Sequence, residues 1–219
     1  MVNPTGQKRS TTRILCLAGS LRRDSWNRRL LQAAVAATSG AEMLLYEELA
    51  SVPMFNEDAE DNCASGVHQL RVAVGMADGL LIATPEYNQS FPGVLKNAID
   101  WLSRGSSMLI GEPVAVIGAT TGSWGTRLAQ TALRQVLTAT GALVMPRPMM
   151  FVASVNACFD ARGRLVDPVV DASLRRVLSA LQDWIALHRR GSALLLEHAR
   201  ADDSLPATLS APAAAGCRA

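Results

Sequence analysis

Residues 79–101 read Gly-Leu-Leu-Ile-Ala-Thr-Pro-Glu-Tyr-Asn-Gln-Ser-Phe-Pro-Gly-Val-Leu-Lys-Asn-Ala-Ile-Asp-Trp. An apolar run at 80–83 stops at a Thr-Pro pair and gives way to a polar segment at 86–90. After Pro92-Gly93 the apolar residues recur at helical spacing, which predicts a helix. Open α/β sheets build ligand sites in this way, because the crevice lies outside the carboxyl ends of the strands. We therefore expect this stretch to form one wall of a ligand site.

Further apolar runs flank this stretch and alternate with helical patterns. The runs of strand length are residues 13–18, 43–46, 113–117 and 143–145. Apolar residues recur at helical spacing in the segments 30–37, 67–76, 94–102, 128–137 and 174–187. Strands that alternate with helices predict an α/β fold of three layers, with helices on both faces of a parallel sheet.

The composition indicates one globular domain. Of 219 residues, 49% are hydrophobic and 18% are charged, and the net charge is only +2. Phosphate backbones require concentrated positive charge, so we expect no nucleic-acid partner. No apolar run approaches the roughly 18–20 residues that span a bilayer, and the first twelve residues lack an apolar signal core. We expect a cytoplasmic protein without a membrane partner.

We divide the chain into three segments. Residues 1–11 are expected to be flexible, residues 12–190 to form the folded domain, and residues 191–219 to be a disordered tail. The tail is rich in alanine and shows no sustained period. The four cysteines and three histidines share no motif with metal-ligand spacing, so we expect no metal site.

The first candidate loop follows the strand predicted at the N-terminus and carries Ser20, Arg22, Ser25 and Asn27. A phosphate monoester needs several donors and positive charge, and a helix N-terminus adds free N–H groups and a positive dipole end. The loop is neither a Walker A motif nor a dinucleotide G-x-G-x-x-G motif, because Gly19 stands alone. The alternative is a polar turn in which Ser25 caps a helix and the arginines are solvated.

The second candidate loop, residues 84–90, could present backbone amides to a flat heteroaromatic ring. Pro85 and Tyr87 would form walls, and the Asn88 side chain can both donate and accept hydrogen bonds. The alternative is a surface loop in which Glu86 is merely solvated.

The third candidate loop, residues 120–125, is rich in glycine and ends another predicted strand. Glycine lets a backbone approach a ligand closely, although a tight turn alone would also explain the composition. The loops that end strands one, three and four of a doubly wound sheet converge. Their coincidence therefore favours one site built from all three.

These residues resemble a known family. Gly-Ser-Leu-Arg at 19–22 with Ser25 and Asn27, and Pro-Glu-Tyr-Asn-x-Ser-x-Pro-Gly-x-Leu-Lys-Asn-Ala-Ile-Asp-Trp at 85–101, are similar to the NADPH-dependent FMN reductase family. That family includes bacterial quinone, chromate and azo-dye reductases of flavodoxin-like fold. The resemblance covers residues 12–187 and implies a five-stranded parallel sheet of order 2-1-3-4-5. It also implies FMN at the switch point between strands one and three.

The resemblance also implies which residues contact FMN. The phosphate would be held by side chains of the first loop: Ser20, Arg22, Ser25 and Asn27. The isoalloxazine ring would be contacted, largely through backbone groups, by the second loop: Pro85, Glu86, Tyr87 and Asn88. Thr120 and Gly122 stand where family members often have Ser-Pro-Gly, and would complete the site. Arg104 would lie near a subunit contact.

The activity implied is that of an FMN-dependent oxidoreductase. Hydride would pass from NADPH or NADH through bound FMN to a small electron acceptor (a quinone, free flavin, chromate or an azo compound) by ping-pong kinetics. Since the chemistry belongs to the cofactor, we expect no catalytic side chain. A homodimer or homotetramer is expected, because relatives have a second subunit that walls the site.

Two alternatives share the topology. A flavodoxin-like electron carrier would bind FMN but need a protein partner, and the mildly basic charge argues against it, since carriers are usually strongly acidic. A phospho-receiver would need aspartates clustered at the strand ends. The first predicted strand ends in Ala-Gly-Ser and the third in Thr-Pro, which disfavours a receiver.

Overall fold

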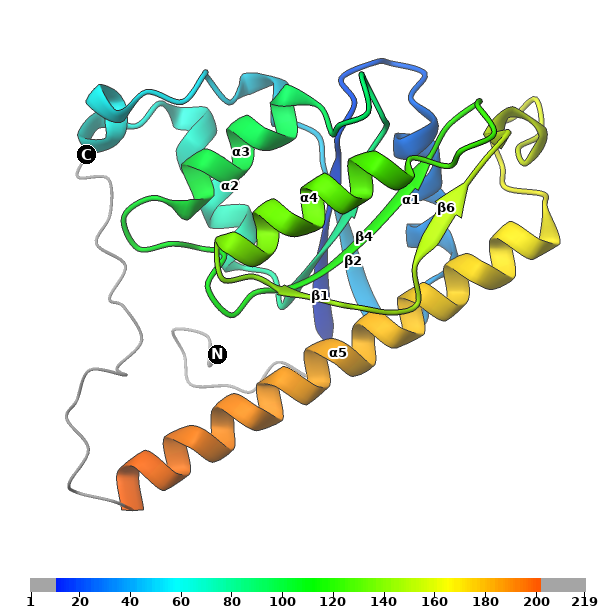
Figure 1. Cartoon of the computed structure of the whole chain (residues 1–219). Helices are drawn as coiled ribbons and strands as arrows, with labels where there is room; N and C mark the ends of the chain where they lie inside the picture. The colour runs from blue at the N-terminus through cyan, green and yellow to red at the C-terminus, as the bar shows by residue number, and fades with distance from the viewer. Residues whose placement is uncertain (1–10, 202–219) are drawn as a thin grey trace.

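The computed structural model describes residues 11–201, with side chains described as far as Arg189 (Figure 1). A parallel sheet lies at its centre and consists of β1 (Thr12–Ala18), β2 (Ala41–Tyr46), β3 (Gly79–Ala83), β4 (Pro113–Ala119), β5 (Leu143–Val144) and β6 (Met150–Val152). The strand order is β2-β1-β3-β4-β5, with β6 paired to β4 as well. The predicted α/β class and the order 2-1-3-4-5 are confirmed.

Helices cover both faces of this sheet. They are α1 (Trp26–Ala37), α2 (Ser65–Gly75), α3 (Gly93–Ser103), α4 (Arg127–Ala139) and α5 (Pro168–Ala201), with short 3-10 turns at η1 (Leu49–Ser51), η2 (Glu57–Asn62) and η3 (Val155–Ala157). Side chains alternate along a strand, so Ile14 and Cys16 of β1 pack beneath α1 and α5. Leu15 and Leu17 pack beneath α2, α3 and α4. This arrangement makes the three predicted layers (Figure 1).

The fifth strand is divided into two pieces. β5 pairs with the start of β4, Pro113 opposite Leu143, and β6 pairs with its end, Ile117 opposite Met150. Pro146 and Pro148 lie between the pieces, and neither can donate a backbone hydrogen bond to the sheet. The expected single strand at 143–145 is therefore a shorter strand, β5, followed by a second piece, β6. The weak apolar pattern after residue 150 did not predict β6.

The last helix is longer than the expected 174–187. Pro168 occupies its first position, where a missing N–H costs nothing, and the Asp167 carboxylate accepts the N–H groups of Val169 at 2.8 Å and Val170 at 2.9 Å. The helix continues to Ala201 and so enters the segment expected to be disordered. The rest of that segment, 202–219, and the expected flexible residues 1–10 lie outside the described residues. Within 11–201, no helix combines the length and hydrophobicity of a membrane span.

Candidate functional site

The three candidate loops meet at the carboxyl edge of the sheet. The Gly19 N–H donates to the Ala83 carbonyl at 2.8 Å, and the Thr84 N–H donates to the Ile117 carbonyl at 3.0 Å. A Cβ added at Gly19 would lie 3.2 Å from Pro85 Cδ and 2.6 Å from Leu95 Cδ1. Glycine at this position therefore lets the first loop pass close to the second loop and to α3 without displacing the Leu95 side chain. The predicted convergence is confirmed as a backbone arrangement.

The first loop presents free positive charge at the start of α1. Arg22 and Arg23 are exposed, and neither has a carboxylate partner among the described residues. Ser25 is 3% exposed, and its hydroxyl oxygen accepts the Arg28 N–H at 3.3 Å. Ser25 therefore does cap the helix, as the simpler interpretation held, while its own hydroxyl proton remains available. The Arg22 N–H lies 3.4 Å from the Ser20 hydroxyl oxygen.

Asn27 is buried and joins this loop to the end of β4. Its side-chain amide donates to the Ala119 carbonyl at 3.0 Å, and its Oδ1 accepts the Ala119 N–H at 2.8 Å. These two hydrogen bonds use the oxygen and one N–H of the side-chain amide, so the second N–H remains for a ligand. Asn27 therefore positions the start of α1 against the third loop, a role that the sequence alone did not indicate.

The second loop contains a tight turn. Tyr87 and Ser90 exchange backbone hydrogen bonds of 2.9 and 3.0 Å, and the two residues between them, Asn88 and Gln89, have φ of 49° and 62°. Two positive φ angles in a two-residue connection define a type I′ turn. Asn tolerates this region, whereas Gln89 adopts it at a cost in backbone energy of the kind found at functional sites. The turn holds the Tyr87 ring in an exposed position.

The alternative interpretation, that Glu86 is merely solvated, is wrong. Its Oε2 accepts the N–H of Leu128 at 2.9 Å and that of Ala129 at 3.0 Å. These N–H groups belong to the first turn of α4, where no partner is available within the helix. The carboxylate of the second loop thus caps the helix that follows the third loop.

The third loop is held by the segment that follows β6. Thr120 donates its N–H to the Val152 carbonyl at 2.9 Å and accepts the Val155 N–H at 3.1 Å. Gly122 donates its N–H to the Thr120 hydroxyl at 3.2 Å and accepts the Ser154 N–H at 3.0 Å. Gly122 is exposed at the edge of the site. These contacts depend on β6, which the sequence did not reveal.

Two polar residues in the motif at 85–101 stabilise the fold. Asn97 accepts the Phe55 N–H at 2.7 Å and donates to the Pro53 carbonyl at 2.8 Å, and Trp101 Nε1 donates to the same carbonyl at 2.9 Å. Both side chains lie on α3 and hold the segment that follows β2. Their presence in the motif is therefore explained by packing between elements.

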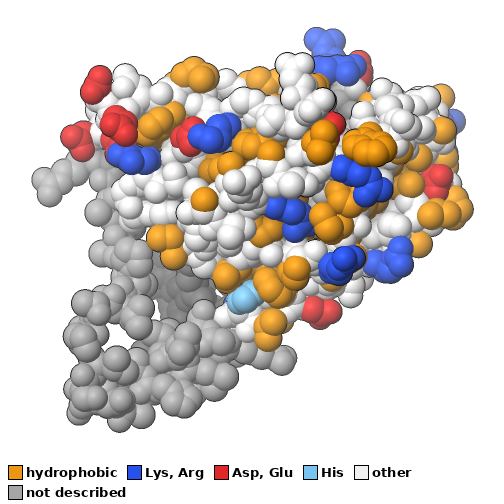
Figure 2. Space-filling view, in the orientation of Figure 1, with side chains coloured by type: hydrophobic (Ala, Val, Ile, Leu, Met, Phe, Trp, Pro, Cys, Tyr) orange, Lys and Arg blue, Asp and Glu red, His pale blue; other side chains and the backbone are white. Residues whose placement is uncertain are grey.

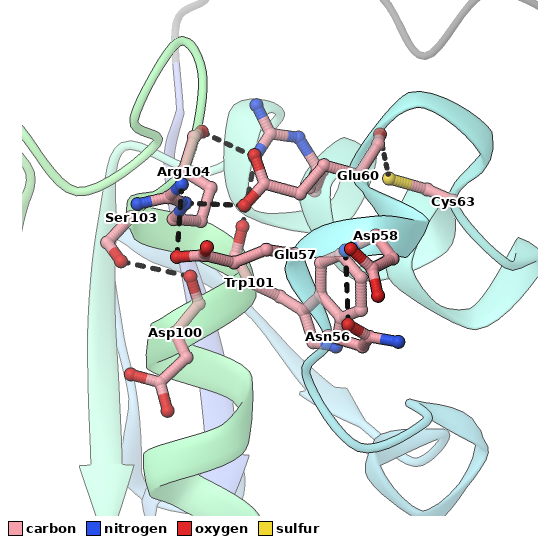
Figure 3. Close-up of polar contacts among 10 residues, drawn as sticks. Asn56, Glu57, Asp58, Glu60, Cys63, Asp100, Trp101, Ser103 and Arg104 are labelled. Carbon is pink, nitrogen blue, oxygen red and sulfur yellow. Dashed lines mark hydrogen bonds and ion pairs between the residues drawn. The ribbon is translucent and has the colours of Figure 1, made fainter.

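Arg104 pairs with η2 (Figure 3). Its Nε lies 2.6 Å from Glu60 Oε1, and its Nη2 lies 3.5 Å from Glu57 Oε1. The hydrogen bond to Glu60 raises the pKa of Arg104, helped by the charges of both carboxylates. Exposed pairs of this kind contribute little stability. The expectation that Arg104 lies near a subunit contact stays a prediction.

The available groups fit FMN. At the first loop, two free guanidinium groups, a serine hydroxyl and a helix N-terminus match the needs of a phosphate monoester. At the second loop, the backbone N–H groups of Glu86 and Asn88 have no acceptor among the described residues and can bond a heteroaromatic ring. The same residues contain no cluster of three His, Cys, Asp or Glu side chains that could hold a metal ion.

Known proteins are similar to this chain over most of its length. Residues 12–157 match the family described as NADPH-dependent FMN reductase. An NAD(P)H-dependent FMN reductase of Pseudomonas aeruginosa is 38% identical over 175 residues, covering 79% of this chain and 95% of that protein. A 2-hydroxy-1,4-benzoquinone reductase of Burkholderia sp is 34% identical, covering 79% of this chain and 96% of that protein.

A solved structure shows the same similarity. FerB, a flavoenzyme NAD(P)H:(acceptor) oxidoreductase from Paracoccus denitrificans, superposes with a TM-score of 0.76 and 32% identity. The match covers 81% of this chain and 99% of FerB. The fold, the loops and the similarity over almost the full length of these relatives lead to one assignment: this chain belongs to the NADPH-dependent FMN reductase family.

Proposed function

We propose that the chain binds FMN across the three loops, oxidises NADPH or NADH, and reduces a small electron acceptor. One observation carries this proposal: α1 and α4 both begin at the carboxyl edge of the sheet, but the two helix starts differ in what they offer an anion. The start of α1 has two exposed arginines that pair with no carboxylate among residues 11–189, whereas the start of α4 is occupied by Glu86. The start of α1 is therefore more favourable for a phosphate group than the start of α4.

The phosphate contacts follow from this position. Arg22 would supply a charged, forked donor and Ser20 and Ser25 would supply hydroxyl donors. Asn27 would contribute its one remaining N–H, because its other polar atoms bond Ala119. The N–H groups at the start of α1 and the dipole of the helix would favour the same anion.

The second and third loops would then orient the isoalloxazine ring. Bound FMN supplies the capacity to take up and release hydride. The N–H groups of Glu86 and Asn88 would donate to polar atoms at the ring edge, and Pro85 and Tyr87 would contact its faces. Thr120 and Gly122 would close the opposite side with backbone that lacks bulky side chains. Donors placed in this way favour the negative charge that reduction adds.

We propose ping-pong kinetics, in which the nicotinamide and the acceptor would contact the same face of the bound flavin in turn. The relatives' names include an FMN reductase and a quinone reductase. A quinone or free flavin is accordingly the acceptor class that we put first, with chromate and azo compounds as further candidates. Parallel lines in double-reciprocal plots at several NADPH concentrations would support this order of events.

We also propose a homodimer or homotetramer whose second subunit walls the site. Large apolar side chains are exposed on the second loop, the third loop and the start of α4: Tyr87 at 47%, Trp124 at 63% and Leu128 at 42%. In Figure 2, hydrophobic and basic side chains mix over the region of α4, while acidic ones gather at the end that η2 occupies. Light scattering after size exclusion would give the mass, and a monomer would contradict this part of the proposal.

The visible spectrum of the purified protein, before and after anaerobic addition of NADPH, tests the proposed function. Flavin bands that bleach with NADPH would support a self-sufficient reductase. Flavin bands that do not bleach would instead favour an electron carrier that needs a protein partner. A colourless protein that takes up no added FMN would show that the three loops serve another phosphate ligand.

A further inference from the structure

The first turn of α4 receives no cap from its own loop. Thr126 precedes the helix in a left-handed conformation, with φ of 59°, and its side chain caps no backbone N–H. The Thr126 hydroxyl instead accepts a hydrogen bond from Gln130 Nε2 at 3.2 Å, and both side chains are buried. The N–H groups that a capping residue would normally satisfy are left for another part of the chain.

Glu86 supplies the missing acceptor from a loop 42 residues earlier. Its Oε2 accepts both the Leu128 and the Ala129 N–H, at 2.9 and 3.0 Å. An ionised acceptor makes stronger hydrogen bonds than a neutral one. A carboxylate at the positive end of a helix gains a further charge–dipole attraction.

These two hydrogen bonds also determine how the second loop is attached. Among the described residues, they are the only hydrogen bonds that join residues 85–91 to another helix, strand or loop beyond the neighbouring Thr84. The turn from Tyr87 to Ser90 is closed only on itself. Without the Glu86 carboxylate, no hydrogen bond among the described residues would attach this segment to α4.

We propose that Glu86 is a positioning residue for the flavin reaction. Its carboxylate fixes residues 85–88 to α4, so that the free N–H groups of Glu86 and Asn88 face the position of the isoalloxazine ring. This inference rests on the proposed function, because it assumes that FMN lies against the second loop. The side chain acts through the loop and need not touch the flavin.

Three variants separate positioning from simple stabilisation of a helix. Glu86→Ala removes the acceptor, while Glu86→Gln retains an amide oxygen that can accept the same N–H groups without the charge. Asp167→Ala is the matched control, because Asp167 is also a carboxylate that accepts two first-turn N–H groups, but at the start of α5. The other hydrogen bonds of Asp167, to Cys158 and Asp171, involve its backbone and are retained in the alanine variant.

Three measurements on the full chain distinguish these possibilities. Amide hydrogen exchange on the FMN-free protein reports the cap directly, and we expect Glu86→Ala to lower protection at Leu128 and Ala129 by about tenfold. Fluorescence titration with FMN should show binding weakened about tenfold in Glu86→Ala and about threefold or less in Glu86→Gln. The visible circular dichroism of the bound flavin should change in Glu86→Ala and return in Glu86→Gln. Asp167→Ala should leave both flavin measurements unchanged.

Several results would overturn the inference. Lost protection at Leu128 and Ala129 with unchanged FMN affinity and dichroism would make Glu86 a helix cap and nothing more. Equal losses of FMN affinity in Glu86→Ala and Asp167→Ala would indicate general destabilisation. If Glu86→Ala does not fold, Glu86→Asp replaces it, since a shorter side chain keeps the charge but withdraws from the N–H groups. Wild-type protein that takes up no FMN would overturn the proposed function itself, which the wild-type titration reveals first.

Discussion

The helices α1 and α4 begin at the same edge of the sheet, but their positive ends are used differently. At α1 the serine cap is neutral and the nearby arginines are exposed. At α4 a carboxylate from a distant loop takes two N–H groups. Equivalent positions in a doubly wound fold thus acquire opposite preferences for an anion, because a helix terminus attracts an anion only while no protein anion occupies it.

The strongest test of this comparison removes the charge at α1. The double substitution Arg22→Ala and Ser25→Ala should weaken FMN binding by about 3 kcal/mol or more, given about 1.5–3 kcal/mol for each hydrogen bond to a charged group. That loss corresponds to a factor above about one hundred in a flavin titration. The double variant should also lose about 1 kcal/mol of unfolding free energy, because the Ser25 side chain caps α1.

Single variants separate these effects. Arg22→Ala alone should lower FMN affinity with little change in unfolding, because the side chain is exposed. Arg175→Ala is the control for net charge, since Arg175 pairs with Asp171 on α5. If Arg22→Ala and Arg175→Ala bind FMN equally well, the phosphate does not lie at the start of α1.

A second test addresses how closely the loops approach each other. A Cβ at Gly118 would lie 2.0 Å from the Thr126 hydroxyl and 2.6 Å from the Thr84 carbonyl, so Gly118→Ala forces the second and third loops apart. Such overpacking costs about 1–3 kcal/mol, and more where backbone must move. At Gly122 the nearest atom would be 3.7 Å away, so Gly122→Ala should keep the unfolding free energy within about 0.5 kcal/mol.

Urea unfolding and FMN titration of these two glycine variants sharpen the comparison. Gly118→Ala should lose stability and FMN affinity together. Gly122→Ala should lose FMN affinity alone, if the flavin approaches that backbone as proposed. Wild-type stability in Gly118→Ala would contradict the arrangement of the loops around β4.

The sequence predicted most of the fold because its main signals are local. Buried parallel strands read as continuous apolar runs, and the amphipathic helices show their period directly. The prediction of the fifth strand was wrong for a local reason as well. The prolines at 146 and 148 interrupt the strand, and β6, with three residues, is too short to produce a pattern. The start of α5 was missed because Asp167-Pro168 precedes the first apolar repeat.

The site was harder to predict because its connections are long-range. The sequence indicated which loops converge, since strand order and the carboxyl ends determine that. It did not indicate that Asn27 bonds Ala119 or that Glu86 caps α4, because partners 92 and 42 residues away leave no periodic signal. A charged residue in a polar loop reads as solvated until the fold places a helix terminus beside it.

A second carboxylate, at the opposite edge of the sheet, extends the comparison. Glu112 precedes β4, and its Oε1 is buried without a hydrogen-bond partner among the described residues. Its pKa is raised to about 8, chiefly by burial and secondly by the Asp78 carboxylate, while the Arg189 guanidinium lowers it. The Glu86 carboxylate accepts two backbone N–H groups, whereas Glu112 Oε1 accepts no hydrogen bond from the described residues. Burial without such donors favours the protonated form of Glu112 at neutral pH.

This difference predicts a dependence of stability on pH. The Glu112 carboxyl loses its proton near pH 4.5 when unfolded and near pH 8 when folded. Between these values the folded state holds a proton that the unfolded state lacks, so the unfolding free energy should fall as pH rises, by up to about 1.4 kcal/mol per pH unit. Glu112→Gln keeps the shape without the titration, and urea unfolding from pH 5 to 9 should show a flatter profile. Glu42→Gln, which removes the carboxylate paired with Arg13, is the control at the same edge. Parallel profiles for wild type and Glu112→Gln would mean that Glu112 is ionised in the folded protein, with Arg189 shared between two carboxylates.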